Sequence, residues 1–105
     1  MSEPSRGDVW LADCGFTAKV RPVAVISIPF KDTDRALITV IPHTTSLVGS
    51  AHEIVVPVSW LAAGAFNVQA TFPLVPPRFI RRLGILTADQ LAMLEAGLKR
   101  WEGLK

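Results

Sequence analysis

The chain has 105 residues, of which 50% are hydrophobic and 19% are charged, and its mean hydropathy is +0.36. This length fits one domain, and this apolar content is enough for a packed core, so we expect residues 1–105 to form a single domain without long disorder. The net charge of +2 is too small to indicate a polyanionic partner by itself.

Short runs rich in β-branched residues predict a mostly antiparallel sheet. We expect Pro42 to end the third strand and Gly84 to break the last one. A hydrophilic connection over residues 29–34 and a polar loop over residues 43–49 flank the third strand, and residues 59–64 predict one helical turn. The expected strands are, in chain order, residues 8–13, 20–28, 36–41, 53–56, 66–72 and 79–86.

One amphipathic helix is predicted at the C-terminal end. Thr87 and Gln90 have the spacing of a capping box, and Gly103 has the position of a C-terminal cap. Apolar residues recur along one face of this helix at Leu91, Leu94, Leu98 and Trp101. Five or six short strands followed by one helix predict a mainly β domain that resembles a small barrel.

Cys14 is the only cysteine, which excludes an internal disulfide, and the sequence has no Cys/His cluster with zinc spacing. Residues 1–6 lack the apolar run of a signal peptide, and the later apolar stretches are too short to cross a bilayer. We therefore expect a cytoplasmic protein with no metal, no other cofactor and no membrane association. A Gly-rich phosphate loop, paired carboxylates at helical spacing and a nucleophile elbow are also missing from the sequence.

The basic residues flank a stretch of the sequence that is almost free of charge. Between Ala36 and Pro77 the only charged residue is Glu53. If the two flanks meet, their cations form a basic surface, although scattered solvated charges explain the same pattern. The flanking cations are Lys19, Arg21, Lys31 and Arg35 before the stretch, and Arg78, Arg81 and Arg82 after it.

Polar side chains at two strand ends are the candidate site. If the second and third strands are antiparallel neighbours, Arg21 at the start of one approaches Thr44 at the end of the other. A guanidinium beside hydroxyl groups can bind a phosphate. Arg21 can equally be a surface residue, and Thr44 and Ser46 can be turn formers. His43 has a reference pKa near neutrality and can act as an acid or base, or point away from the site.

These residues lie in segments that resemble the landmarks of MazF/PemK toxins in order and spacing. The first three are Arg6-Gly7-Asp8-Val9-Trp10, Arg21-Pro22-Val23-Ala24-Val25-Ile26 and Pro42-His43-Thr44-Thr45-Ser46. Later landmarks are Gln69, Leu83-Gly84 and Trp101-Glu102-Gly103-Leu104. The resemblance covers nearly the whole chain.

The resemblance implies a dimeric SH3-like barrel of the CcdB/PemK type that cuts single-stranded RNA without a metal and is neutralised by a cognate antitoxin. In that family the 2′-hydroxyl attacks the adjacent phosphate, which leaves a 2′,3′-cyclic phosphate and a 5′-hydroxyl. Arg21 and Thr44 correspond to the catalytic pair. The expected RNA-binding residues are Lys19, His43, Thr45, Ser46, Gln69 and Arg78.

The chain departs from the family pattern between its first two strands. Members usually carry a longer loop there with a Gly-Ser-Glu type segment, whereas residues 14–20 are all that separate Asp13 from Arg21. A shorter loop removes substrate contacts. Two alternatives therefore stay open, namely a barrel that binds RNA or protein without catalysis, and a gyrase poison similar to CcdB in which Trp101 is the terminal tryptophan.

Overall fold

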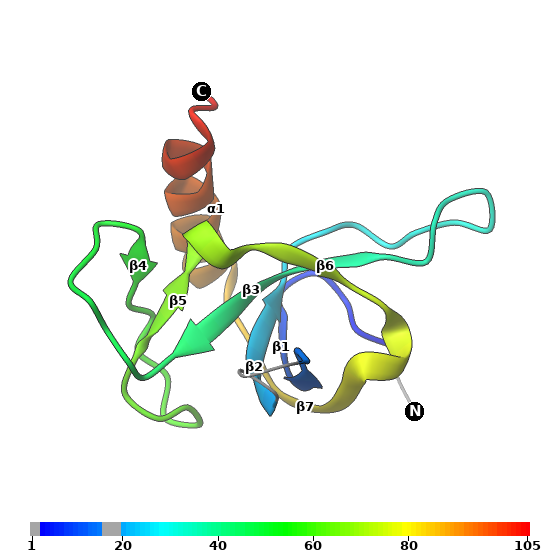
Figure 1. Ribbon diagram of the computed structural model, residues 1–105, viewed down its shortest axis with the longest axis horizontal. Helices are drawn as coiled ribbons and strands as arrows, with labels where there is room; N and C mark the ends of the chain where they lie inside the picture. Colours follow the sequence, from blue (N-terminus) through cyan, green and yellow to red (C-terminus); the bar gives the residue numbers. More distant parts are fainter. Residues whose placement is uncertain (1–2, 16–19) are drawn as a thin grey trace.

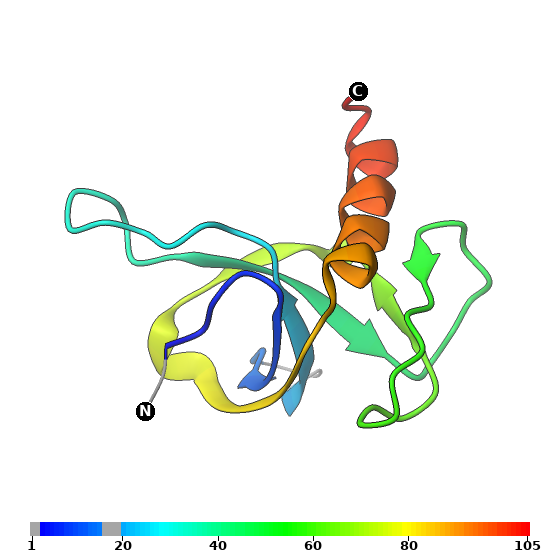
Figure 2. The ribbon, with the colours of Figure 1, turned by 180° about the vertical axis from the view of Figure 1, so that it is seen from behind.

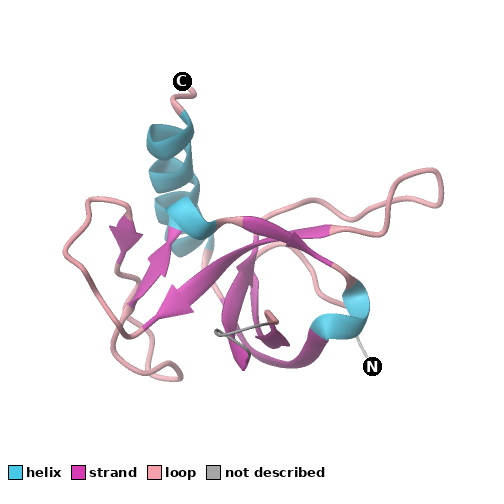
Figure 3. Cartoon of the chain, in the orientation of Figure 1, coloured by secondary structure: helices cyan, strands magenta, loops and turns pink. Residues whose placement is uncertain are grey.

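The computed structural model describes residues 3–15 and 20–105. Its strands and its C-terminal helix are shown in Figure 1 and, coloured by secondary structure, in Figure 3. The strands are β1 (Asp8–Asp13), β2 (Val20–Val25), β3 (Ile38–Thr44), β4 (Glu53–Ile54), β5 (Ala65–Asn67), β6 (Phe72–Leu74) and β7 (Phe79–Ile85). Two 3₁₀ turns, η1 (Val68–Ala70) and η2 (Pro76–Arg78), and one helix, α1 (Ala88–Glu102), complete the list.

All of the strand pairs are antiparallel, and the strands follow the order β4-β5-β3-β2-β1-β7, with β6 also paired to β3. The sheet curves strongly, so that β1, β2, β6 and β7 surround one space in Figure 1. Within the described part of the chain, β7 pairs only with β1, and the sheet does not close. The expected mainly β fold with one C-terminal helix is confirmed, as a barrel that stays open.

The core has two parts. One lies between the sheet and α1 and centres on the fully buried Phe66, Ile41 and Leu94. The other fills the inside of the curved sheet and centres on Trp10, Val23 and Val40. Because both faces of β1, β2 and β3 are largely buried, apolar residues follow one another directly in them, as in Val9-Trp10-Leu11-Ala12 of β1, instead of alternating with polar ones.

The predicted helix is confirmed at both of its ends. Thr87 accepts a hydrogen bond from the backbone N–H of Gln90, whose side chain accepts one from the backbone N–H of Thr87. Gly103 ends the helix in the left-handed conformation. Trp101 differs from the expectation, since it lies past the core, is 45% exposed and packs against the His52 ring. Figure 2 shows α1 projecting beyond the sheet.

The prediction that Pro42 ends the third strand is wrong, because β3 continues to Thr44. Thr39 accepts a hydrogen bond from Ile26 on the β2 side, so alternation turns the backbone nitrogen of Pro42 toward the opposite edge of β3. That edge is paired with β6 at residues 38–40 and with β5 at residues 43–44. Pro42 falls in the gap between them, where no N–H is required.

Other boundaries also differ from the predictions. β7 runs through Gly84, where an added Cβ would lie 2.5 Å from the Trp60 indole, so glycine here serves close packing rather than a break. Residues 66–72 form the end of β5, then η1 and the start of β6 instead of one strand. Residues 59–64 contain turns and bends but no helix.

Candidate functional site

A pocket of about 300 Å³ lies where β2 begins and β3 ends. In the sheet, Val23 pairs with Pro42, and extending this register by two residues sets Arg21 opposite Thr44. The proximity expected from the sequence is therefore present, and both side chains belong to the same pocket. The lining residues are Leu11, Val20, Arg21, Pro22, His43, Thr44, Thr45, Ser46 and Ala62.

The Thr44 hydroxyl has a local structural role that leaves its proton free to donate to a ligand. Its Oγ1 accepts a hydrogen bond of 3.0 Å from the backbone N–H of Ser46 and so shapes the turn after β3. A hydroxyl group has one proton to donate besides its lone pairs. The Thr44 hydroxyl can therefore form the turn and still donate to an oxygen in the pocket. Thr45 and Ser46 are exposed at its rim.

Arg21 supplies the positive charge of this pocket. It is half-buried on β2 and pairs across the sheet with the buried Ala12 of β1. Burial raises the pKa of the nearby Cys14 thiol, and the charge of Arg21 opposes that rise. A cation with few aqueous neighbours attracts an anion more strongly than a fully solvated one does.

His43 belongs to the lining of this pocket, but alternation along β3 turns its ring to the other face of the sheet from Thr44, toward the core beneath α1. The side chain is 5% exposed, and its ring meets that of Phe66 edge to face with 4.9 Å between centroids. Burial lowers the pKa of His43, and the charge of Arg21 adds to this effect. The imidazole is therefore neutral at pH 7 and presents one donor and one acceptor nitrogen.

The other expected RNA-binding residues do not line the pocket. Lys19 lies outside the described residues. Gln69 is exposed on η1, which packs near α1. Arg78 is exposed, and its guanidinium forms an ion pair with Asp13 at 3.2 Å. Arg81, expected only as one of the flanking cations, pairs with the lining residue Leu11 across β1 and β7, a register that the sequence does not reveal.

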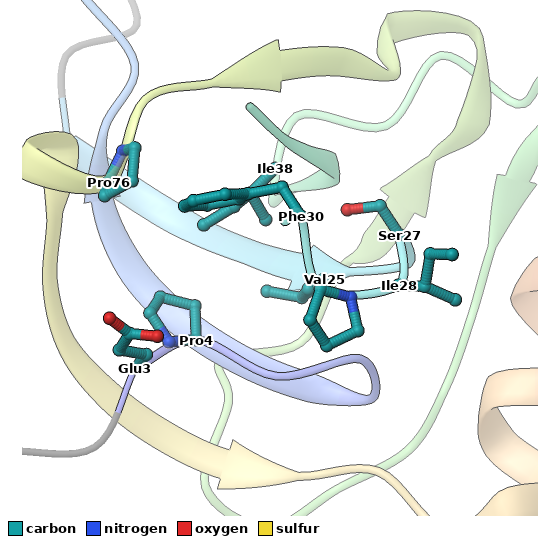
Figure 4. Close-up of a pocket in the computed structure, with 9 residues that line it drawn as sticks. Glu3, Pro4, Val25, Ser27, Ile28, Phe30, Ile38 and Pro76 are labelled. Atoms are coloured by element: carbon teal, nitrogen blue, oxygen red, sulfur yellow. The ribbon is translucent and has the colours of Figure 1, made fainter. Parts of the chain in front are cut away.

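A smaller pocket of about 80 Å³ lies at the opposite end of β2 (Figure 4). Its labelled side chains are mostly apolar, with the carboxylate of Glu3 at one edge and the hydroxyl of Ser27 at another. No cation belongs to its described lining, so this pocket does not suit a phosphate.

Groups of three or more His, Cys, Asp or Glu side chains that could hold a metal ion do not occur among residues 3–15 and 20–105. In the same ranges, no helix has both the length and the apolar character needed to span a bilayer.

The fold and this pocket define a small, open β-barrel with an Arg-Thr-His site at one end. The sequence matches no protein-family model and no curated protein. The structure is similar along its whole length to solved MazF structures, and the chain has the MazF toxin fold.

Three of these solved structures define the likeness. The chain aligns over 100% of its length, at 25% identity and a TM-score of 0.78, with 100% of a chain of the MazE-MazF structure from Deinococcus radiodurans. An endoribonuclease in complex with its cognate antitoxin from Mycobacterial species gives 21% identity and a TM-score of 0.79, with coverage of 100% and 98%. The Mycobacterium tuberculosis toxin MazF-mt6 gives 24% identity and 0.75, with coverage of 93% and 98%.

Proposed function

We propose that this protein is the toxin of a toxin–antitoxin pair and cuts single-stranded RNA at short sequence motifs without a metal. The observation that carries this proposal is the placement of Arg21 and Thr44 in one pocket, in a chain with the fold of endoribonucleases. The cytoplasm is the compartment in which such an enzyme meets its RNA.

The chemistry of the pocket fits transfer of a phosphodiester to a neighbouring hydroxyl. The RNA 2′-oxygen loses its proton and bonds to phosphorus, while the bond from phosphorus to the 5′-oxygen breaks and that oxygen gains a proton. The products are a 2′,3′-cyclic phosphate and a 5′-hydroxyl. No bond to the protein is formed, so the side chains act by position and charge.

Arg21 is the group that stabilises the negative charge developing on the phosphoryl oxygens. A guanidinium is a poor base but a planar fork of hydrogen-bond donors, so Arg21 can donate two hydrogen bonds to the phosphoryl oxygens. The hydroxyl of Thr44 donates to the same phosphate from the opposite strand. The two catalytic residues thus approach the scissile group from β2 and β3.

The remaining contacts hold the RNA strand. Thr45 and Ser46 can donate to phosphate or ribose at the rim of the pocket, and His43 lines its wall. Lys19 and Arg78 would add electrostatic attraction, and Gln69 would read a base edge. Because Gln69 and Arg78 lie outside the pocket lining, they would contact RNA that runs beyond it.

We also propose that the protein forms a homodimer and binds an antitoxin. The solved MazE-MazF structures contain a toxin with its antitoxin, which supports the second part of this proposal. Large apolar side chains are exposed on this protein, including Ile28 at 75% and Val48 at 85%. Burying such groups favours association, and a disordered acidic segment with apolar anchors would suit the pocket that holds Arg21. Light scattering of the pure protein at micromolar concentration tests for a dimer.

The deciding experiment incubates the protein with a long single-stranded RNA in EDTA and maps the ends of the fragments. We expect discrete cuts with cyclic-phosphate ends from the wild type and none from Arg21→Ala. Arg35→Ala is the matched control, because Arg35 is exposed in the connection between β2 and β3, outside the pocket lining, and should leave cutting unchanged. Wild-type rates from folded Arg21→Ala contradict the proposal.

The same preparation separates the alternatives. A folded wild type that binds RNA in a salt-dependent manner without cutting it is a binding barrel. A protein that stabilises the gyrase cleavage complex on DNA is instead a gyrase poison, which has no need of the Arg21 and Thr44 pair.

A further inference from the structure

A second, larger pocket adjoins the candidate catalytic pocket. Its volume is about 480 Å³, it is open to solvent, and most of its lining comes from the segment between β4 and β5. The two pockets share His43 and Ala62, so they meet at a common wall. The residues around the larger pocket are His43, Val55, Val56, Pro57, Val58, Ser59, Leu61, Ala62, Ala63 and Gly64.

The two pockets differ in chemistry. The catalytic pocket has Arg21 and three hydroxyl side chains, whereas the described lining of the larger pocket contains no charged residue. Its walls are aliphatic, and its side-chain hydrogen-bonding groups are the hydroxyl of Ser59 and the imidazole of His43. Such a lining favours a flat, neutral ligand that has polar edges.

The His43 ring is closely packed where the pockets meet. Its ring packs against Phe66 on one side. On another side it approaches Gly64 so closely that an added Cβ would lie 2.8 Å from its Cε1 atom. A neutral imidazole has one donor and one acceptor nitrogen, which is a combination that can read the edge of a base.

We propose that the larger pocket receives the unpaired nucleobase next to the scissile phosphate and that His43 is a specificity-determining residue at its wall. This inference rests on the proposed function, since the phosphate must lie beside Arg21 and Thr44 for its neighbouring base to reach this pocket. Sequence-specific RNA recognition generally uses bases that are turned out of a single strand in this way. The base bound in the larger pocket would therefore be one position of the cleavage motif.

The test combines an altered substrate with a filled pocket. A short RNA with one cleavage site is made with an abasic ribonucleotide, which keeps the 2′-hydroxyl, at each position beside the cut. In the protein, Ala63→Leu fills the pocket from an exposed position that does not line the catalytic pocket. Ala51→Leu is the matched control at an exposed turn outside both linings. Ser59→Leu is a second filling variant, should Ala63→Leu fail to fold.

We expect one abasic position to lower the wild-type kcat/KM about tenfold, the size of one stacked base. Ala63→Leu should show the same loss on the intact RNA and no further loss on the abasic RNA, because both changes remove one interaction. Ala51→Leu should behave as the wild type does. Independent, multiplying losses, or no sensitivity to any abasic position, overturn the inference while leaving cleavage intact. A wild type that cuts no RNA overturns the proposed function and this inference with it.

Discussion

Arg21 and Thr44 line one pocket, and the β2–β3 register that pairs Val23 with Pro42 sets them opposite each other when it is continued by two residues. A slip of one residue would turn Thr44 to the other face of the sheet. Both faces of these strands are packed, with Ala24 against one core and Val23 against the other, so the register is strongly determined. The core therefore positions the candidate catalytic pair.

Arg21→Lys tests whether the guanidinium acts only by its charge. Lysine keeps the charge but loses the planar pair of donors, so we expect cleavage to fall about 100-fold, with a smaller loss than in Arg21→Ala. Single-turnover cleavage of a labelled RNA measures this, and the melting temperature should not change. Equal rates for Arg21→Lys and the wild type would show that fork geometry is irrelevant.

The hydroxyl of Thr44 can be tested with a pair of conservative variants. Thr44→Val removes both the donor to phosphate and the acceptor for the Ser46 N–H, so cleavage should fall at least about tenfold and stability by roughly 0.5–1.5 kcal/mol. Thr44→Ser should keep most of both. Cleavage rates and urea unfolding of the two proteins give the comparison. A fully active Thr44→Val would remove Thr44 from the proposed mechanism.

The sequence predicts those features of the fold that depend on neighbouring residues, and it misses those that depend on pairing between distant segments. The capping box of Thr87 and Gln90 is a local pattern, and the helix begins where it was predicted. Pro42 is a strand breaker by local rules, yet it lies in the gap between β5 and β6, which only the tertiary pairing creates. Trp101 follows the periodicity of the helix but extends past the core that the other apolar residues reach.

Some residues of the candidate site can be predicted from local sequence, and others cannot. Arg21 and Thr44 follow from one assumption about neighbouring strands, and the structure confirms that they share a pocket. Ala62 also lines this pocket, and Arg81 pairs with the lining residue Leu11, but a loop return and a strand pairing distant in sequence bring them there. No periodicity near either residue indicates that position.

The lowered pKa of His43 predicts a pH-dependent stability. Between its folded pKa and the unfolded value near 6.5, the unfolded chain binds more protons than the folded one, so stability rises with pH. The free energy of unfolding is unaffected by this ionisation above about pH 6.5, where the imidazole is neutral in both states. It falls as the pH drops below that value, because the unfolded chain takes up the proton first. Melting temperatures at pH 5–8 should show this slope in the wild type and a weaker slope in His43→Gln.

His43→Gln also separates two roles of this residue in cleavage. If the imidazole transfers a proton, the variant loses an ionisation from the pH profile of kcat/KM. If it reads a base, the variant keeps the shape of the profile and changes the sequence preference. We expect the second result, and the loss of an ionisation would contradict it.

Gly64→Ala should disturb the catalytic pair from outside the catalytic pocket. The added Cβ would lie 2.2 Å from the backbone oxygen of Thr44 and 2.8 Å from the His43 ring, so strand and loop must separate. Overpacking of this kind costs about 1–3 kcal/mol, which lowers the melting temperature of a domain this size by at least about 4 °C. Cleavage should fall as well, because Thr44 moves with its carbonyl.

Gly97→Ala is the contrast for that variant. Its Cβ would meet the end of the Ile54 side chain at 2.8 Å, and a side chain can rotate where a backbone oxygen cannot. Alanine also favours the helix by about 1 kcal/mol over glycine, which offsets part of the clash. We therefore expect a smaller change in melting temperature and unchanged cleavage for Gly97→Ala. If both variants cut RNA equally well, the close approach of Gly64 to Thr44 does not position the catalytic hydroxyl.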